Sequence, residues 1–445
     1  MNYGKNLTSG GITAALLKFA APMIVGNLLQ QVYNLADTFV VGRYLGEDAL
    51  AAVGSTYTLT TFIYSIIIGL CMGSGSLVSY YYGSNNPEKQ RKTAALSFAF
   101  ILIVTVISET LTLCFTGNIL SILRTPSDIM SLTADYVQII LAGIIFIFLY
   151  NFYAYMLRAS GDSFTPLVFL GTASVLNVIL DVIFVVFCGF GVKGAAFATL
   201  LAQAVSGTGL AVYSVLKERN LRFGISDMKA DKKEIAEVLR MSSAASVQQS
   251  VMNFGILMIQ GLVNSFGTVV MAAFTVAVKI DTLAYMPAQE FGNAFSIFIS
   301  QNYGAGKYER IQKCVKRAFM VSGIFCLVIS AFVGFFSEEL MCIFVDSSNT
   351  DIIKTGSQYL MTEGTFYIGI GVLFLLYGYY RGINKPEMSL ILTVISLGLR
   401  VLLAYILSGF EQIGVFGIWI SIPTGWIIAD ITGCIYMKKC IKIAE

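Results

Sequence analysis

Apolar runs of about 20 residues, separated by short polar segments, recur along almost the whole chain. A run of this length is what an α-helix needs to cross the hydrocarbon core of a lipid bilayer. Charged residues make up only 12% of the 445 positions, about half of the share that a soluble domain carries. Segments in which apolar and polar residues alternate, as in the strands of an outer-membrane barrel, are not apparent. The sequence therefore predicts an all-α, polytopic membrane protein.

The apolar runs predict twelve transmembrane helices, at about 17–42, 51–80, 93–116, 130–157, 164–188, 194–216, 238–264, 270–302, 314–336, 352–380, 387–409 and 413–437. With this number of spans, most of the 29 Lys and Arg residues fall on the side of the membrane that holds both termini. Because positively charged loops stay on the cytoplasmic side, we expect both termini to be cytoplasmic.

The longest charged segment, 217–240, is expected to be a basic cytoplasmic linker between an N-terminal lobe (1–216) and a C-terminal lobe (241–445). The two halves resemble each other. "SYYYGSNNPEKQRKTA" (79–94) and "SQNYGAGKYERIQKCV" (300–315) match at an offset of 221 residues, and "GFGVKGAAFA" (189–198) and "QIGVFGIWIS" (412–421) match at 223. Two repeated six-helix bundles around a central cleft are an architecture of transporters that work by alternating access.

Several kinds of chemistry are excluded by composition. The sequence contains no histidine, which rules out imidazole catalysis and a histidine proton relay. The eight cysteines are scattered without a CxxC pair, so they indicate neither disulfides nor a metal site. No phosphate-binding P-loop and no Ser/Lys nucleophile motif is visible. We therefore expect neither an enzyme nor a cofactor or resident metal, and no nucleic-acid partner.

The run "VLNVILDVIFVVF" (175–187) places Asn177 and Asp181 on one face of a predicted helix. Asp181 lies about 12 Å below the outer end of its span, and Asp37 and Thr199 lie about 9 Å below the outer ends of theirs. Intramembrane acids are costly and mark ion pathways, although such groups can also simply form interhelical hydrogen bonds. A buried carboxyl pair suits a proton, and two carboxylates with an amide and a hydroxyl suit Na⁺.

Five stretches, "AAPMIVGNLLQQVYNLADTFVVGRYLGEDALAAVG", "LRASGDSFTP", "LNVILD", "GVKGAAFAT" and "YYRGINKP", resemble those of the multidrug and toxic compound extrusion (MATE) transporters, at matching positions over nearly the whole chain. The chain is similar to the bacterial DinF-like branch, because the span at 238–264 lacks the acid of the other bacterial branch. The resemblance implies a multi-pass protein of the bacterial cytoplasmic (inner) membrane that couples H⁺ or Na⁺ to drug export. It implies the coupling role for Asp37, Asn177, Asp181 and Thr199.

Other polar residues inside predicted spans are possible substrate contacts: Gln31, Asn34, Gln248, Asn253, Asp281 and Glu290. The amides lie on the first and seventh spans, which we expect to face each other across the cleft. The acids lie on the eighth span, on either side of Pro287, which is expected to kink that helix.

The repeat also gives counterparts of the acids in the second half. At the offsets above, Met258 corresponds to Asp37, and Arg400 corresponds to Asn177. An arginine inside the membrane needs a partner, and Glu363 in the tenth span is the nearest acid by depth. We therefore expect a structural ion pair between Glu363 and Arg400.

The expected function is that of a secondary active exporter, in which cation binding from outside releases an amphipathic, often cationic, small molecule. The alternative is a flippase or exporter of a lipid-linked or other amphipathic metabolite on the same architecture. A cleft that holds phosphate needs several basic residues, whereas only Lys279 and Arg400 lie within predicted spans. We expect a monomer whose partners are these small molecules and the lipid bilayer.

Overall fold

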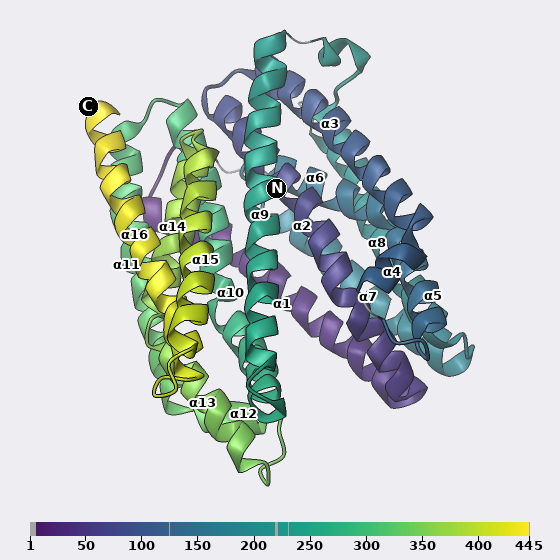
Figure 1. The fold of residues 1–445 in the computed structure, drawn as a ribbon. Helices are drawn as coiled ribbons and strands as arrows, with labels where there is room; N and C mark the ends of the chain where they lie inside the picture. Colours follow the sequence, from purple (N-terminus) through teal and green to yellow (C-terminus); the bar gives the residue numbers. More distant parts are fainter. Residues whose placement is uncertain (1–5, 124, 219–220, 230, 445) are drawn as a thin grey trace. The chain divides into compact units, whose positions relative to one another are not determined.

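The computed structural model describes residues 6–123, 125–218, 221–229 and 231–444 (Figure 1). Every regular element in these residues is helical, which confirms the predicted fold class. In chain order the elements are α1 (Ile12–Leu45), α2 (Glu47–Gly83), α3 (Pro87–Cys114), α4 (Thr116–Ile122), α5 (Met130–Leu141), α6 (Ile144–Ala159), α7 (Phe164–Asp181), η1 (Val182–Phe187), α8 (Gly191–Lys217), η3 (Ile225–Met228), α9 (Lys232–Asn264), α10 (Thr268–Gly304), α11 (Tyr308–Phe335), α12 (Ser337–Cys342), α13 (Thr350–Gly364), α14 (Tyr367–Gly382), α15 (Pro386–Ser408) and α16 (Phe416–Ala444).

The chain forms two compact units. The first contains Ala21–Ser246, and the second contains Leu7–Ala20 together with the chain from Val247 onward. These boundaries differ from those of the lobes expected at 1–216 and 241–445, because the first turns of α1 belong to the second unit. The first half of α9 belongs, in turn, to the first unit.

Hydrogen bonds explain why the segment before α1 belongs to the second unit. The backbone N–H of Leu7 donates to Oε1 of Gln301 over 3.1 Å, and Nδ2 of Asn302 donates to the carbonyl oxygen of Leu7 over 3.3 Å. The guanidinium of Arg310 donates to the carbonyl oxygen of Gly10 over 2.8 Å. The chain that leads into α1 is therefore attached to the end of α10 and the start of α11.

The internal repeat predicted from the sequence is confirmed by the lengths of the helices. α2 and α10 both have 37 residues, α3 and α11 both have 28, and α6 and α14 both have 16. Gly46 and Gly267, which precede α2 and α10, have positive φ angles of 86° and 96°. Glycine adopts this conformation at no steric cost, so each half makes the same turn between its first two long helices.

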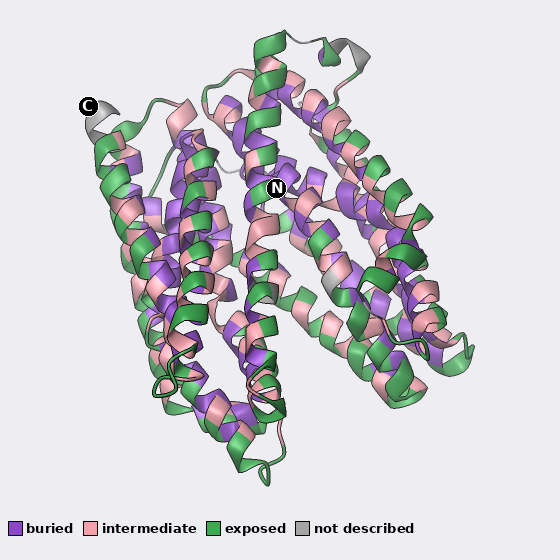
Figure 2. Ribbon diagram, viewed as in Figure 1, coloured by how far each residue is buried: buried purple, intermediate pink, exposed green. Residues whose placement is uncertain are grey.

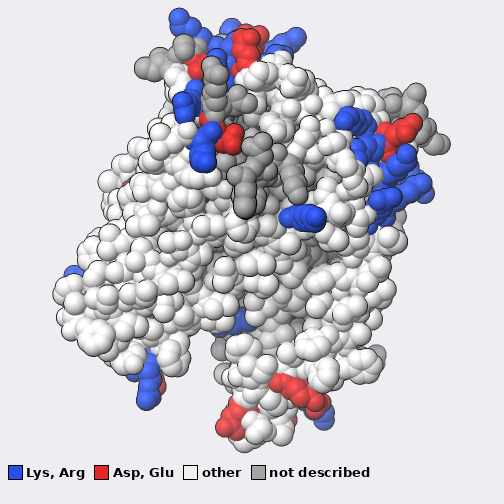
Figure 3. All heavy atoms as spheres, turned by 180° about the vertical axis from the view of Figure 1, so that it is seen from behind, with Lys and Arg blue, Asp and Glu red and all other residues white. Residues whose placement is uncertain are grey.

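Nine helices in the described part of the chain are long and apolar enough to cross a membrane, or eleven when two bent pairs count as one span each. The pairs are α5–α6, bent by 40°, and α13–α14, bent by 52°. α9 occupies the range predicted for the seventh span, and its amide and hydroxyl side chains make it less apolar. In Figure 3 most Lys, Arg, Asp and Glu side chains gather in a few groups, and wide stretches of the surface carry none, as expected of a multi-pass membrane protein.

Buried residues occur along the helices of both units (Figure 2, purple), and aromatic side chains are among the largest of them. In the first unit, the ring of Phe98 lies 5.2 Å from the rings of both Phe148 and Phe152. In the second unit, Phe274 stacks on Trp419 with ring centroids 5.6 Å apart. Rings packed in this way contribute about 0.5–1.5 kcal/mol per pair beyond the area they bury.

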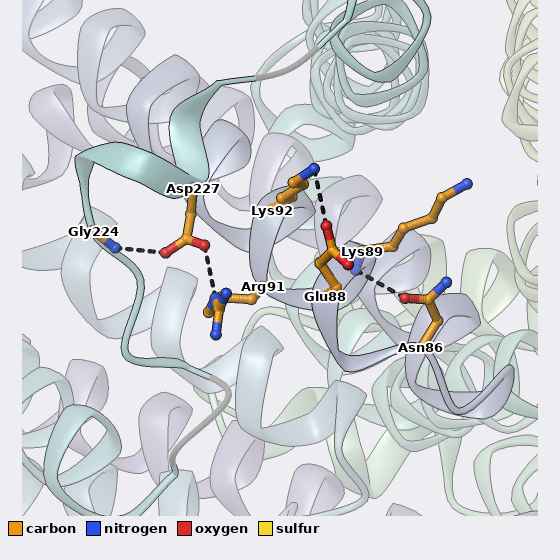
Figure 4. Close-up of polar contacts among 7 residues, drawn as sticks. All are labelled: Asn86, Glu88, Lys89, Arg91, Lys92, Gly224 and Asp227. Carbon is orange, nitrogen blue, oxygen red and sulfur yellow. Dashed lines mark hydrogen bonds and ion pairs between the residues drawn. The ribbon is translucent and has the colours of Figure 1, made fainter.

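The predicted basic linker, 217–240, is described except for residues 219–220 and 230. Its described part is anchored within the first unit. Figure 4 shows Asp227 of η3 accepting hydrogen bonds from Nε of Arg91 over 2.7 Å and from the backbone N–H of Gly224 over 2.9 Å. Arg91 belongs to the first turns of α3, whose N-cap residue Asn86 accepts a bond from the N–H of Lys89. The linker is therefore fixed to the start of α3.

Candidate functional site

The four residues of the predicted coupling site come from three helices of the first unit. Asp37 lies on α1, Asn177 and Asp181 lie on the last turns of α7, and Thr199 lies on α8. Nδ2 of Asn177 donates a hydrogen bond to Oγ1 of Thr199 over 3.3 Å. Asn177 and Asp181 are buried, with 1% and 0% of their surface exposed, whereas Asp37 and Thr199 are half-buried.

The two acids of this group share one electrostatic environment. The carboxyl groups of Asp37 and Asp181 are close enough to interact electrostatically, and both act on the hydroxyl groups of Tyr33 and Tyr136. Two buried carboxylates repel each other and lose their hydration. A proton or another cation bound between them relieves both costs.

Several buried oxygen atoms of this group accept no hydrogen bond: Oδ1 of Asp37, Oδ1 of Asn177 and both carboxyl oxygens of Asp181. Leaving a buried acceptor without a partner costs on the order of 1–3 kcal/mol, and more for a charged group. A set made only of oxygen atoms suits a proton or a hard cation. The residues present therefore fit a bound proton or a hard cation. In the described residues, no group of three or more His, Cys, Asp or Glu side chains is placed to hold a metal.

A cavity of about 120 Å³ lies beside Asn177 and Thr199. The polar residues of its lining are Gln30, Tyr33, Tyr64, Tyr150, Asn151, Ser174, Asn177, Thr199, Gln203 and Ser206. This volume accommodates a cation with a few water molecules. Drug-sized ligands occupy pockets of about 300–1,000 Å³, so the cavity in this structure is too small for one.

Two residues that line this cavity, Tyr33 and Gln203, were not predicted from the sequence, although helical spacing could have identified them. Tyr33 precedes Asp37 by four residues, and Gln203 follows Thr199 by four. Residues four apart lie on the same face of a helix, so both belong to the face that carries a predicted site residue.

The helix that carries Asp181 changes its geometry directly after this residue. The π-helix η1 covers Val182–Phe187, and the backbone N–H of Cys188 donates to the carbonyl oxygen of Ile183, five residues earlier, over 2.9 Å. Single π-helical turns are rare in proteins and occur frequently at functional sites. No pattern in the sequence had indicated this segment.

The four amides predicted to contact substrate lie in different surroundings. Gln31 and Asn34 are half-buried on α1, but the cavity is lined by their neighbour Gln30. On α9, Gln248 is buried and Asn253 is half-buried. The role of these amides stays a prediction.

A second buried polar cluster lies in the second unit. Asp281 of α10 and Glu363 of α13 are 4% and 1% exposed, and their side chains interact directly. Arg400 of α15 is 8% exposed and acts electrostatically on both carboxyl groups. Arg400 therefore has two acids near it, whereas the sequence had suggested only Glu363. The close ion pair between Glu363 and Arg400 stays a prediction.

The two clusters occupy corresponding places in the repeat. Their corresponding members are Tyr64 and Tyr285, Tyr136 and Tyr359, and Asn177 and Arg400. The second unit thus carries a guanidinium at the position where the first unit has an amide beside its cavity. The matching tyrosines are also a signal that could have added Tyr64 and Tyr136 to the predicted site.

Glu290, the other acid predicted to contact substrate, takes part in a local hydrogen-bond network. Nδ2 of Asn293 donates to Oε1 of Glu290 over 3.3 Å, and the guanidinium of Arg381 donates to Oδ1 of Asn293 over 3.0 Å. Nε of Arg381 donates in addition to Oγ of Ser296. This network joins α10 to α14 and favours a structural role for Glu290.

Comparison with known proteins places the chain among transporters. The chain is 30% identical over 394 residues to the probable multidrug resistance protein YpnP of Bacillus subtilis, covering 88% of this chain and 87% of that protein. It is 25% identical over 448 residues to the FAD transporter of Shewanella oneidensis, covering 98% and 96%. A solved structure of a multidrug resistance MATE family transporter in an outward-facing conformation has a TM-score of 0.93 and 27% identity, covering 100% of this chain and 99% of that chain.

A family model agrees with these matches. The MatE model matches residues 22–183 and 244–406, which are more than half of the chain and contain parts of both repeats. The chain therefore belongs to the MatE family of multidrug transporters.

Proposed function

We propose that this protein is a secondary active exporter, which couples inward movement of H⁺ or Na⁺ to outward movement of amphipathic, often cationic, small molecules. The observation that carries the proposal is the pair Asp37 and Asp181, whose buried oxygens accept no hydrogen bond and which interact electrostatically. The polar cavity beside Asn177 and Thr199 supports it, because its volume suits a small cation. Membership of a family of multidrug transporters supports the export of small molecules.

In the proposed cycle, a cation from the outside binds at Asp37 and Asp181 and neutralises the pair. Neutralisation weakens the binding of a cationic substrate, which then leaves to the outside. After the binding site is exposed to the cytoplasm, the cation leaves and a new substrate molecule binds. The change from α-helical to π-helical hydrogen bonding directly after Asp181 supports a helix end whose geometry responds to the charge of the carboxyl group.

The membrane potential supplies enough free energy for this exchange. One positive charge that moves inward releases about 2.3 kcal/mol per 100 mV. This corresponds to a concentration ratio of about fifty at room temperature, since each factor of ten requires about 1.4 kcal/mol. The proposed export therefore requires neither nucleotide hydrolysis nor a cofactor.

Transport into inside-out vesicles tests the proposal. A fluorescent cationic dye should accumulate in vesicles with wild-type protein when a pH or Na⁺ gradient is imposed, and Asp37→Asn and Asp181→Asn should abolish this accumulation. Asp135→Asn is the matched control, because Asp135 is a partly exposed acid of the same unit that pairs with Lys193 over 3.1 Å. Gradient-driven accumulation that persists in both Asp37→Asn and Asp181→Asn would refute the coupling role. Imposing each gradient alone identifies the coupling ion.

A second candidate is the export of an amphipathic metabolite, and the similarity to a protein named as an FAD transporter favours it. In this case the same acids would drive transport of a different substrate. Inside-out vesicles supplied with the dye or with FAD in the medium separate the two candidates, because only the accumulation of the transported compound should depend on Asp181.

The proposal also covers the oligomeric state of the protein, its membrane and its orientation in that membrane. We expect a monomer in the bacterial cytoplasmic (inner) membrane with both termini in the cytoplasm. A reporter enzyme that is active only outside the cytoplasm, fused to the C-terminus, should remain inactive. An active reporter would contradict this orientation.

A further inference from the structure

A dense group of positive charges lies at the start of α11, in the second unit. Its members, called the basic group below, are Lys307, Arg310, Lys313, Lys316 and Arg317. One acid, Glu309, lies in the same stretch, and it pairs with Lys313 over 3.6 Å. Among the described residues, no acid forms an ion pair with Lys316 or Arg317, and both side chains are exposed. The basic group therefore carries a large positive charge that the protein itself does not neutralise.

Lys316 and Arg317 lie where the membrane-spanning part of α11 begins. The chain from 318 to 336 contains no charged residue and has about the length that crosses the hydrocarbon core. Two cations directly before such a run lie at the depth of the lipid headgroups. In the orientation proposed above, these headgroups belong to the cytoplasmic leaflet.

The internal repeat shows that these two cations are not needed to orient a span. At the offset of 221 residues, Lys313 corresponds to Lys92 of α3, so both units carry a base at this position. Lys316 and Arg317 correspond to Ala95 and Leu96. Only the second unit thus extends its positive charge by one further helical turn toward the membrane.

Hydrogen bonds fix part of the basic group without neutralising it. Nζ of Lys307 donates to the carbonyl oxygen of Thr8 over 2.8 Å, and the guanidinium of Arg310 donates to the carbonyl oxygen of Ser9 over 2.9 Å. Carbonyl oxygens carry no net charge, and Arg310 and Arg317 remain close enough to repel each other. An anion bound beside them relieves this repulsion, and a phosphate also accepts charge-assisted hydrogen bonds from a guanidinium.

An exposed apolar face continues from the basic group along α11. Met320, Ile324 and Val328 are 58%, 58% and 62% exposed. They follow Lys316 and Arg317 at spacings of three and four residues, which places all five side chains on one face of the helix. This face is positively charged at the end of the span and apolar beyond it, which matches an anionic headgroup followed by acyl chains.

We propose that this face of α11 binds an anionic phospholipid such as phosphatidylglycerol. The phosphate contacts Lys316 and Arg317, and an acyl chain lies along Met320 and Ile324. Charge complementarity selects this occupant, because basic clusters next to a membrane span attract anionic lipids. The lipid site is independent of the coupling role of the acids in the first unit.

Lipid-dependent stability tests the proposal. Dioctanoyl phosphatidylglycerol is added to the delipidated full-length protein in a neutral detergent, and the unfolding temperature is recorded. This temperature should rise with the lipid concentration, because a ligand of the folded state stabilises it. The double variant Lys316→Gln/Arg317→Gln should need at least a tenfold higher concentration for half of the effect, since each cation near an anionic headgroup contributes roughly a fivefold gain in affinity.

Two variants serve as controls. Lys89→Gln/Lys92→Gln removes the same charge from the corresponding turns of α3 and should keep the lipid dependence of the wild type. Thr13→Val removes the 3.5 Å hydrogen bond that the guanidinium of Arg317 donates to Thr13, but keeps both cations. It should also bind lipid like the wild type. If the double variant fails to fold, Lys316→Gln alone decides the question, with an expected loss of about fivefold.

Two further compounds identify the part of the lipid that is recognised. Dioctanoyl phosphatidylcholine has the same chains and a phosphate but no net charge, and it should stabilise the protein less. Glycerol 3-phosphate has the phosphate without the chains and should have no effect at the same concentrations.

Several results would overturn the inference. An equal effect of the two lipids would show that charge is not recognised, and a full effect of glycerol 3-phosphate would identify a site for soluble anions. Unchanged lipid dependence in Lys316→Gln/Arg317→Gln, or an equal loss in Lys89→Gln/Lys92→Gln, would show that this face of α11 is not the site. The absence of any stabilisation of the wild type would exclude a bound anionic lipid.

Discussion

The side-chain amide of Asn177 donates a hydrogen bond to the hydroxyl of Thr199 over 3.3 Å and so joins α7 to α8, one helical turn from Asp181. Between membrane helices such a bond contributes only about 0.6 kcal/mol on average. The main effect of this bond is therefore to orient the side-chain amide of Asn177. With the nitrogen of the amide engaged by Thr199, the oxygen of Asn177 accepts no hydrogen bond and remains able to bind a cation.

Removing the acceptor of this bond should weaken cation binding. Thr199→Val keeps the shape of the side chain but leaves the amide of Asn177 free to turn, so the half-saturating concentration of the coupling cation should rise about five- to tenfold, or about 1 kcal/mol. Thr199→Ser keeps the hydroxyl and should behave like wild type. The measurement is the rate of dye transport against cation concentration. Equal values for the two variants would contradict this role of the bond.

The cluster of Asp281, Glu363 and Arg400 should be needed for stability. Arg400→Met removes the positive charge beside two buried acids, and breaking a buried charge pair costs about 3–5 kcal/mol. The double variant Arg400→Met/Glu363→Gln should recover part of this loss, because fewer buried charges then lack a partner. Thermal unfolding in detergent measures both effects. Lys279→Met, which removes an exposed cation of the same unit, should change little. An Arg400→Met protein as stable as wild type would show that the guanidinium does not neutralise these acids.

The contact between α10 and α14 should not tolerate a methyl group at Gly378. A Cβ atom there would lie 2.4 Å from the carbonyl oxygen of Gly292, and this oxygen belongs to the backbone and cannot turn away. Gly378→Ala should therefore lower the free energy of unfolding by about 1–3 kcal/mol. Gly323→Ala, at an open position of α11, should leave it unchanged or raise it, because alanine favours a helix by about 1 kcal/mol over glycine. Similar unfolding temperatures for the two variants would contradict the close packing.

The attachment of the linker should depend on pH. The backbone N–H of Gly224 and the guanidinium of Arg91 hold the pKa of Asp227 below its usual range, because both stabilise the carboxylate. A carboxyl group with a lowered pKa in the folded state stabilises the protein above the pKa of the unfolded chain. This contribution is lost as the pH falls through the lower pKa of the folded state.

Asp227→Asn should therefore lower the unfolding temperature at pH 7, and the difference from wild type should shrink as the pH falls below about 4. Glu88→Gln is the control, since its ion pair with Lys92 spans one turn of an accessible helix face and contributes little. Scanning the unfolding temperature of all three proteins between pH 7 and pH 3 checks this. A difference between wild type and Asp227→Asn that does not change with pH would argue against an ionised Asp227 as the anchor.

Much of the fold could be predicted from the sequence because a lipid bilayer sets requirements that each transmembrane helix must meet by itself. Each span must be apolar and must satisfy its own backbone hydrogen bonds, so hydropathy alone predicts where the spans lie. The repeat predicted equal elements in the two halves, as the 37 residues of both α2 and α10 confirm. The depths of Asp37 and Asp181 that follow from helical rise stay predictions.

The direction of each side chain could not be predicted in the same way. Gln30 lines the polar cavity while its neighbour Gln31 does not, because one residue turns the helix by about 100°. Distant residues likewise meet only through packing, as Asp281 and Glu363 do across α10 and α13. The π-helix after Asp181 escaped prediction because it depends on the hydrogen bonds available in the folded helix rather than on residue type.

The amino-acid sequence by itself thus predicted the all-helical fold, the approximate positions of the long apolar helices and the repeat, because these depend on the chain and the bilayer alone. Tertiary structure decided which oxygens gather around a cavity in the first unit and which charged side chains meet in the second. Both depend on how helices rotate and bend against one another. That rotation is set by the packing of all neighbouring side chains at once, which no local pattern of residues records.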